Sequence, residues 1–141
     1  MKFYLYLLTL LGFALVSPLN IQAQNTLTDK EVLQNVKTAL QVGSAKELAR
    51  YFKTSLEVSL LNETKSLSKS EAESLMKTFF EKYKPKGFQY AHQGEAKSGI
   101  LYSMGKYDYI KTNTKGHLLV YIQLKKIKDA YLIESLNISS M

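Results

Sequence analysis

The fold depends on one stretch of the sequence, "SKSEAESLMKTFFEKYKPKGFQYAHQG" (residues 68–94), in which a helical pattern changes into an extended one. Ser68 and Glu71 fit the capping box that starts a helix. The apolar residues that follow recur at helical spacing on one face: Ala72, Leu75, Met76, Phe79, Phe80 and Tyr83. Pro85 and Gly87 end this pattern. The stretch therefore predicts a helix that covers a sheet, followed directly by a strand.

After this helix the sequence predicts antiparallel strands joined by short turns, over residues 88–96, 100–110, 116–126 and 130–139. The turns are marked by Ser98-Gly99, by Asn113 with Gly116, and by Lys128-Asp129. The third of these strands alternates, with Leu118, Val120, Ile122 and Leu124 on one face and His117, Leu119, Tyr121 and Gln123 on the other. We interpret the first set as core.

The last predicted strand has apolar residues on both of its faces. Alternation places Leu132, Leu136 and Ile138 on the same face as Glu134, with Tyr131 and Ile133 opposite. A sheet with two partly apolar faces is expected to have helices on one side and a partner over part of the other.

The residues before the central stretch predict two helices and a broken pair of short strands. Thr28 or Asp29 can cap a first helix, whose buried face is formed by Val32, Leu33, Val36 and Leu40 and which stops at Gly43. Ser44 caps a short second helix, "AKELARYF", in which Leu48 and Phe52 continue the buried stripe. Leu56, Val58 and Leu60 then alternate as a strand, and "LNETKSL" (residues 61–67) turns the chain. The whole pattern predicts an α+β domain in which a curved antiparallel sheet wraps around the third helix.

The N-terminus has the pattern of a secretory signal peptide. Lys2 precedes an apolar run, residues 3–16, that is shorter than the roughly 20 residues of a transmembrane helix. We expect cleavage after Ala23, export to the periplasm or the medium, a single domain over residues 24–141 and no transmembrane anchor after cleavage. Because the chain has no cysteine, it offers neither a disulfide nor a lipid-accepting residue at the cleavage site.

The chain is basic, with a formal charge of +7 that falls to +6 when Lys2 is removed with the leader. Arg50 is the single arginine, so the forked side chain that reads bases is almost absent and no specific nucleic acid partner is expected. The lysines are scattered, most densely at residues 82–86 and 125–128. The simplest interpretation is a solvated surface, and the alternative is weak attraction to anionic lipid, polysaccharide or nucleic acid.

The order of elements resembles the cone-shaped nuclear transport factor 2-like superfamily, also called cystatin-like. Within it, the chain is similar to a family of small exported bacterial proteins with no assigned function, through "GSAKELARYF", the stretch 68–94, "YSMGKY", "VYIQLKK" and "YLIESLNI". The resemblance implies N-terminal helices packed on a curved sheet. It does not choose among the isomerases, dehydratases, ligand sensors and interaction modules of the superfamily. The acidic base and tyrosine donor of ketosteroid isomerases have no matching motif here.

His92 is the first candidate site residue, because alternation places it on one strand face with Phe88 and Tyr90. If that face points into the cone, His92 could act as a general base, since its reference pKa of about 6.5 lies near working pH. The other interpretations are that it fills space while hydrogen-bonded to a backbone group or a tyrosine, or that it contacts a ligand without chemistry.

Three tyrosines and one carboxylate complete the candidate ligand-binding set: Tyr90, Tyr102, Tyr121 and Glu134. The tyrosines would line a ligand site if they face the concave side of the sheet, and cross-strand aromatic pairing is the alternative. Glu134 stands among apolar residues, either as a pocket acid or paired with a lysine. Two separated histidines and no cysteine give no recognisable metal site, and no cofactor motif is present.

These features favour an exported, non-enzymatic module that binds a small apolar ligand or an envelope protein. The alternative is a lyase or isomerase that transfers a proton in the cone, with His92 and either Glu134 or a tyrosine as the acting groups. That chemistry requires the groups to converge to about 3 Å, directly or through one water. Self-association through the sheet into a homodimer is a third hypothesis, compatible with the first.

Overall fold

The computed structural model describes residues 26–96 and 98–141, which form three helices and six strands. The expected signal peptide, residues 1–23, lies outside the described residues. In chain order the elements are α1 (Asp29–Val42), α2 (Ala45–Ala49), β1 (Phe52–Leu60), β2 (Glu63–Ser68), α3 (Lys69–Lys82), β3 (Lys84–Ala96), β4 (Ile100–Lys111), β5 (Thr114–Ile127) and β6 (Ala130–Ser140). None of the helices in these residues is long and apolar enough to cross a bilayer.

The helices begin where the sequence places their caps. Thr28 and Glu31 form a complete capping box at the start of α1, and Gly43 closes that helix in the left-handed conformation, with a φ of 70°. Ser68 caps α3 by accepting a hydrogen bond from the Glu71 amide, at 3.2 Å. The Ser68 hydroxyl also donates to the Glu71 carboxylate, at 2.7 Å, so the two side chains stabilise this end jointly.

The second helix is shorter than the sequence predicts. It ends at Ala49, and Phe52 is the first residue of β1 instead of the last apolar residue of the helix. The reason is a competing backbone partner, because the Ile133 amide of β6 donates to the Tyr51 carbonyl and Phe52 pairs with Ile133. Leu48 is fully buried, as the helical stripe predicted.

The strands form one sheet in the order β2-β1-β6-β5-β4-β3. The last four strands form the predicted antiparallel meander, and β1 and β2 form a hairpin whose turn residues Leu61 and Asn62 have φ angles of 47° and 77°. β1 and β6 pair in parallel, so the sheet is mixed and not wholly antiparallel as expected. This parallel pairing joins the N-terminal hairpin to the meander.

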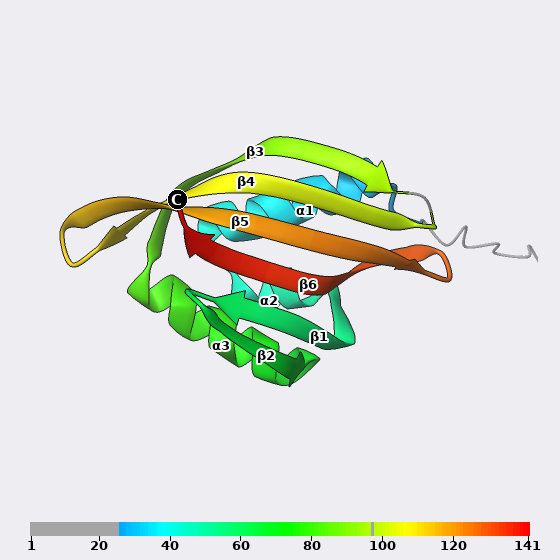
Figure 1. Ribbon diagram of the computed structural model, residues 1–141, viewed down its shortest axis with the longest axis horizontal. Coiled ribbons are helices and arrows are strands. Elements are labelled where there is room, and N and C mark those ends of the chain that lie inside the picture. Colours follow the sequence, from blue (N-terminus) through cyan, green and yellow to red (C-terminus); the bar gives the residue numbers. More distant parts are fainter. Residues whose placement is uncertain (1–25, 97) are drawn as a thin grey trace, which may run out of the picture.

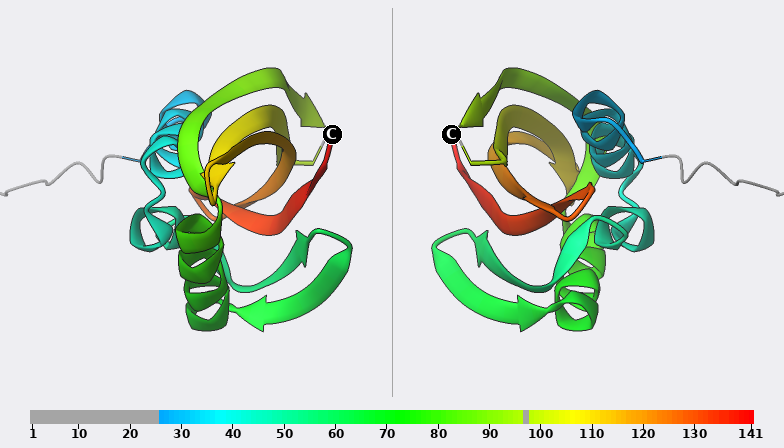
Figure 2. Two further views of the ribbon diagram at one scale, coloured as in Figure 1. Left: turned by 90° about the vertical axis from the view of Figure 1, so that its left-hand side faces the viewer. Right: turned by 90° about the vertical axis from the view of Figure 1, so that its right-hand side faces the viewer.

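All three helices lie on one face of the sheet, and the other face carries none (Figure 1; Figure 2 shows the same separation along the strands). We call these the helix-covered face and the outer face. α1 packs against the edge strand β3, while α3 packs against α2, β1 and β2. The core lies between helices and sheet, and its largest fully buried side chains include Tyr107, Phe52, Phe88, Leu40, Leu48 and Met76. The predicted stripe of α3 and the predicted inner face of β5 both point into it.

Three β-bulges interrupt the meander, at Lys86, Ala91 and Glu134, and the last two decide which strand residues reach that core. In β3, Tyr90 pairs with Gly105 and His92 with Met104, so Ala91 is an extra residue between them. In β6, Ile133 pairs with Leu124 and Ser135 with Gln123, so Glu134 is extra. Each extra residue reverses the alternation that follows it.

The bulge in β6 overturns the faces predicted for that strand. Ile133, Leu136 and Ile138 are all fully buried in the core, although Ile133 was expected opposite the other two. Leu132 pairs with Lys125 and lies on the outer face, not with the core residues.

Candidate functional site

The five candidate residues do not converge in one cavity. Tyr90 alone lies on the helix-covered face, since it pairs with the core position Gly105. His92 pairs with Met104, and Met104 pairs with Tyr121, so all three lie on the outer face. The expectation that His92 shares a face with Phe88 and Tyr90 is therefore wrong, because of the extra residue Ala91. Tyr102 and Glu134 also lie on the outer face.

Tyr90 holds α1 against the sheet. Its hydroxyl donates a 2.8 Å hydrogen bond to the Leu33 carbonyl of α1, and its ring packs edge-on against Phe88 at 5.0 Å. Burial raises the pKa of the Tyr90 phenol above its usual value of 10, an effect opposed by the nearby Ser103 hydroxyl. No hydrogen bond of standard geometry joins Ser103 to the phenol. Tyr90 therefore connects strand β3 to helix α1, and a role for Tyr90 in ligand binding stays a prediction.

Side chains fill the space between helices and sheet. The Phe88 ring lies directly over Gly105, close enough that no Cβ fits at that position. Tyr107 is fully buried beside it on β4, and its hydroxyl donates to the Tyr83 carbonyl at the end of α3, at 2.6 Å. Aromatic rings therefore occupy the part of the cone where an enclosed ligand would have to sit.

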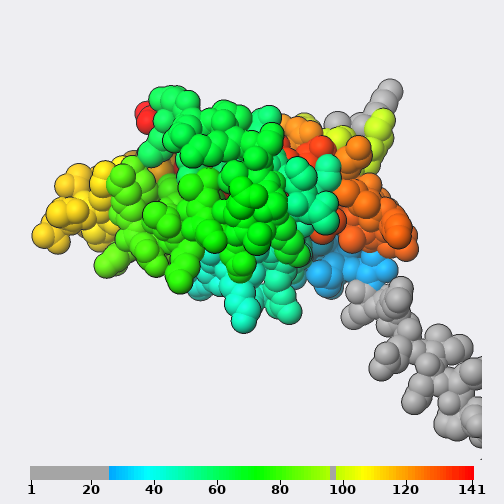
Figure 3. Space-filling view, turned by 90° about the horizontal axis from the view of Figure 1, so that it is seen from below, coloured from blue at the N-terminus to red at the C-terminus, as the bar shows by residue number. Residues whose placement is uncertain are grey.

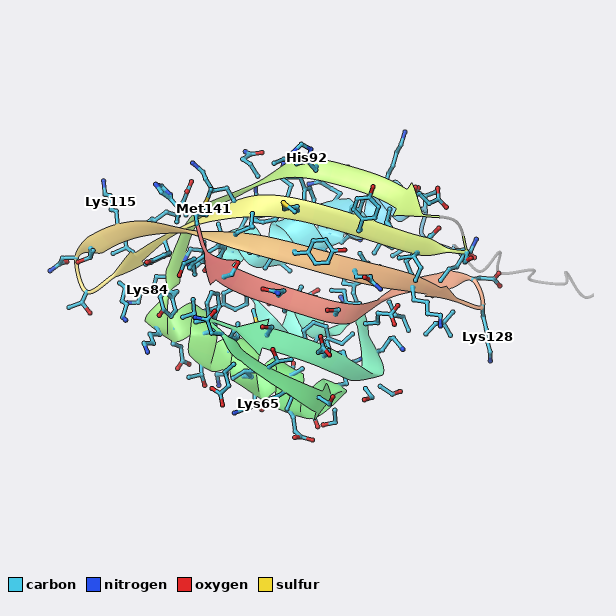
Figure 4. All side chains as sticks on the ribbon, viewed as in Figure 1. Lys65, Lys84, His92, Lys115, Lys128 and Met141 are labelled. Carbon is cyan, nitrogen blue, oxygen red and sulfur yellow. The ribbon has the colours of Figure 1, made fainter. Side chains whose placement is uncertain are left out.

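His92 has no orienting partner. It is exposed on the edge strand β3 (Figure 4), at a hollow of about 430 Å³ between α1 and β3 that Lys30, Gln34 and Lys37 also line. Within residues 26–96 and 98–141, no hydrogen bond or ion pair reaches its ring. A general base needs a second group to orient it, and the described residues place none beside the His92 ring.

Glu134 is paired with a lysine, as one of its two sequence interpretations proposed. Its carboxylate lies 3.8 Å from Lys53 Nζ and accepts a 3.5 Å hydrogen bond from Gln123 Nε2. Strands β4 and β5 separate it from His92, so about 14 Å of sheet lie between their strands at the usual spacing of about 4.8 Å. The pair cannot share one transferable proton, so the version of the enzyme hypothesis that joins His92 to Glu134 has no geometric support.

The outer face has an apolar centre. This centre is formed by Met104, Leu119 and Tyr121. Met104 of β4 pairs with Tyr121 of β5, and Leu119 lies on the same face of β5, two residues before Tyr121. Tyr102, 38% exposed, lies across Gly94, and Leu132 is half-buried further along. Uncharged polar side chains border this centre on the β6 side: Gln123, Ser135, Asn137 and Ser139. On the β4 side, Lys106 pairs with Leu119. No helix covers it (Figure 1).

The sequence interpretation missed one close pair. His117 Nδ1 lies 2.5 Å from Asp108 Oδ1, across β4 and β5. The pair could have been predicted from the sequence, because the turn expected around Asn113 places the residues before it opposite the residues after it. No group of three metal-ligating side chains gathers in the described part of the chain.

Alkaline pH should destabilise the protein through Tyr90 and Tyr107. Burial raises the pKa of both phenols, so the folded state holds these two protons more tightly than the unfolded state. The stability that this adds is complete below about pH 10 and is lost as the pH rises towards the raised folded-state pKa. We expect urea unfolding midpoints to fall above about pH 10, and to fall less in Tyr90→Phe. An equal fall in the variant would contradict the assignment to Tyr90.

The arrangement of helices on one face of a curved six-stranded sheet is the nuclear transport factor 2-like fold. A nuclear transport factor 2-like protein of unknown function from Shewanella oneidensis MR-1 has the same fold, with a TM-score of 0.61 at 13% identity over 79% of this chain and 95% of that chain. The fold predicted from the sequence is thereby confirmed, apart from the parallel pairing of β1 with β6.

Within this class, the chain belongs to the family described as Domain of unknown function (DUF4783), which matches residues 33–139. A family member from Bacteroides ovatus ATCC 8483 is 30% identical, with a TM-score of 0.69 over 76% of this chain and 93% of that chain. Another family member, from Bacteroides uniformis ATCC 8492, is 24% identical, with a TM-score of 0.70 over 78% of this chain and 97% of that chain. Among curated proteins no relative is found. The predicted membership of a family without an assigned function is confirmed.

Proposed function

We propose that this protein is an exported, non-enzymatic binding module whose outer sheet face binds another protein. The observation that carries the proposal is the division of aromatic side chains between the two faces. Phe88 and Tyr107 fill the cone, while Tyr102 and Tyr121 stand on a face that no helix covers. With the Phe88 and Tyr107 rings packed in the core, the exposed sheet face is the surface that we propose for binding, and its aromatic side chains suit a protein partner.

The side chains of the outer face suit a protein interface. Tyrosine and methionine are enriched at such interfaces, and a polar rim around an apolar centre is their usual arrangement. The centre is formed by Met104, Leu119 and Tyr121, and the rim by neutral amides and hydroxyls together with Lys106. Because the centre itself carries no charge, its apolar side chains can meet those of a second copy of this chain. A homodimer is therefore the complex that we test first, and an envelope protein is the other partner of the same face.

Export is part of the proposal and rests on the leader pattern of residues 1–23, with cleavage after Ala23. An exported module of this size has access to envelope proteins. Intact mass of the mature protein, produced from the full-length gene in a bacterial host, tests the cleavage site directly.

The experiment is native mass spectrometry and sedimentation of the gently purified mature protein, with Tyr121→Asp as the test variant. A charge placed at the centre of a packed interface should weaken a dimer at least about 100-fold, the range of strong interface positions. The control is Val42→Asp, because Val42 is 67% exposed on α1, away from the outer face. A wild-type dimer lost only in Tyr121→Asp supports the proposal. A monomeric wild type that also forms no crosslink from this face in the bacterial envelope contradicts it.

One observation favours a small apolar ligand as a second candidate. A hollow of about 520 Å³ lies where the start of α1 meets the β5–β6 turn, and its apolar lining includes Leu27, Val32, Tyr51, Ile127 and Leu132. Its size is within the usual range of ligand pockets. None of the five predicted site residues lines it. A small added mass in the same native spectrum, retained by Tyr121→Asp, would favour this candidate over the protein interface.

A further inference from the structure

The fold gathers lysines that the sequence scatters. The first residues of β3, the last of β4 and the first of β5 meet at one end of the sheet, where Lys84 pairs with Ile110 and Ile110 pairs with Lys115. Lys86, Lys106 and Lys111 belong to the same end. We call these five lysines the hairpin cluster. Figure 4 shows Lys84 and Lys115 at this end, with Lys128 at the opposite end of the sheet, and Figure 3 shows the β4–β5 hairpin projecting from the body of the protein.

Most of the excess positive charge lies in this cluster. The described residues carry seventeen Lys or Arg side chains and twelve Asp or Glu side chains, an excess of five. The hairpin cluster holds five lysines against one carboxylate, Asp108, which gives an excess of four. The remaining twelve basic and eleven acidic side chains nearly balance. The basic character of the chain is therefore a local property of one end.

The lysines of the cluster are largely unpaired. Asp108 contacts His117 at 2.5 Å and Lys106 at 3.6 Å, and so is already engaged. Within the described residues, no carboxylate pairs with Lys84, Lys86 or Lys115, and all three are exposed. Like charges close together repel and oppose folding. An anionic partner would remove that repulsion.

The cluster surrounds a hollow with further recognition groups. Its volume is about 400 Å³, and its lining includes Lys86, Lys115, Tyr109, Asp108 and His117. Asp108 pairs with His117 and Ile110 pairs with Lys115, so these side chains lie on one face of the hairpin, while Tyr109, which pairs with Gly116, turns its ring to the opposite face, against Tyr83. The hollow thus combines two cations and a hydrogen-bonding pair.

We propose that this hollow and the hairpin cluster bind an acidic polysaccharide. The lysines would neutralise carboxylates or sulfates along the polymer, and the Asp108–His117 pair would hydrogen-bond the sugar hydroxyls. A membrane surface fits less well, because the turn between the strands is Thr112-Asn113-Thr114 and offers no apolar side chain to insert. A nucleic acid fits less well because the cluster has no arginine. The hollow shares no lining residue with the centre of the outer face, although Lys106 of the cluster borders that centre. The proposal does not depend on the proposed interface.

The test measures binding of the mature protein to oligogalacturonate at low and moderate salt, with uncharged dextran and poly-L-glutamate as comparison polymers. We expect oligogalacturonate to bind, to bind more tightly than poly-L-glutamate, and to weaken steeply with salt, as polyelectrolyte complexes do. The triple variant Lys84→Gln/Lys86→Gln/Lys115→Gln should lose at least tenfold in affinity. The matched control, Lys65→Gln/Lys125→Gln/Lys128→Gln, changes the net charge equally and should lose less than threefold.

Three results would overturn the proposal. Equal losses in the two triple variants would mean that net charge alone attracts the polymer. Equal binding of poly-L-glutamate and oligogalacturonate would mean that no sugar is recognised. Binding to vesicles containing anionic lipid, with none to oligogalacturonate, would assign the cluster to a membrane surface. Because all six substituted lysines are exposed, circular dichroism should show every variant folded.

Discussion

Replacing Gly105 with Ala is expected to lower the free energy of unfolding by about 3 kcal/mol, at the upper end of the usual cost of overpacking a core. A Cβ at this position would lie 2.6 Å from the Gln89 carbonyl oxygen and 2.6 Å from the Phe88 ring. The carbonyl belongs to the neighbouring strand and cannot move without breaking the β3–β4 pairing. The ring is held in turn by Tyr90 and the core.

Thermal unfolding followed by circular dichroism measures this effect, which corresponds to a fall of roughly 10 °C in Tm for a domain of this size. Gly87→Ala is the matched control on the same pair of strands, because its nearest neighbour, Asp108 Oδ2, would lie at 3.5 Å, an ordinary contact. We expect the control to change the free energy of unfolding by less than about 0.5 kcal/mol. A Gly105→Ala protein as stable as the wild type would mean that Phe88 can move aside, and would reopen the cone as a ligand site.

The elements with a strict hydrophobic period could be predicted from the sequence. The stripe of α3 and the alternation of β5 both follow one period without interruption, so their buried faces are those that the pattern indicates. The helix caps could also be predicted, because Thr28 and Ser68 accept hydrogen bonds from amides only three residues away in the sequence. Local chemistry is sufficient for such elements.

The bulges at Ala91 and Glu134 could not be predicted, because nothing in the sequence beside them marks an extra residue, whereas the bulge at Lys86 lies between Pro85 and Gly87. Ala91 and Glu134 lie within regular-looking strands, with neither a proline nor a glycine beside them to signal an irregularity. One extra residue nevertheless moved His92 from the core to the surface and Ile133 from the surface to the core. The bulge explains why His92 does not share a face with Tyr90, whereas Tyr102 and Tyr121 lie on the outer face through the regular alternation of β4 and β5.

The lysine cluster depends on register in the same way. Residues 84–86, 106 and 111–115 are separated along the chain, and their proximity follows from the pairing of three strands. The turn between β4 and β5 was predicted near Asn113, so Lys111 and Lys115 could have been placed together. The contribution of β3 could not, because its pairing with β4 contains the bulges that set its register.

Tyr107→Ala is expected to have the largest effect of any single substitution proposed for this protein, a loss of about 3 to 5 kcal/mol in the free energy of unfolding. Tyr107 is fully buried, and its ring contacts Phe79 and Phe80 of α3 at centroid distances of 5.6 and 6.3 Å. Removing the ring leaves a cavity between α3 and the sheet and leaves the Tyr83 carbonyl without its donor.

Tyr107→Phe separates these two contributions, because it keeps the ring and removes only the hydroxyl. We expect it to cost about 1 to 2 kcal/mol, the usual price of leaving a buried carbonyl without its hydrogen bond. Urea unfolding of both variants measures the difference, with Tyr102→Ala, on the exposed outer face, expected to cost less than about 1 kcal/mol. If Tyr107→Phe were as unstable as Tyr107→Ala, the hydrogen bond to the end of α3 would be the dominant contribution. If it were as stable as the wild type, ring packing alone would hold α3 on the sheet.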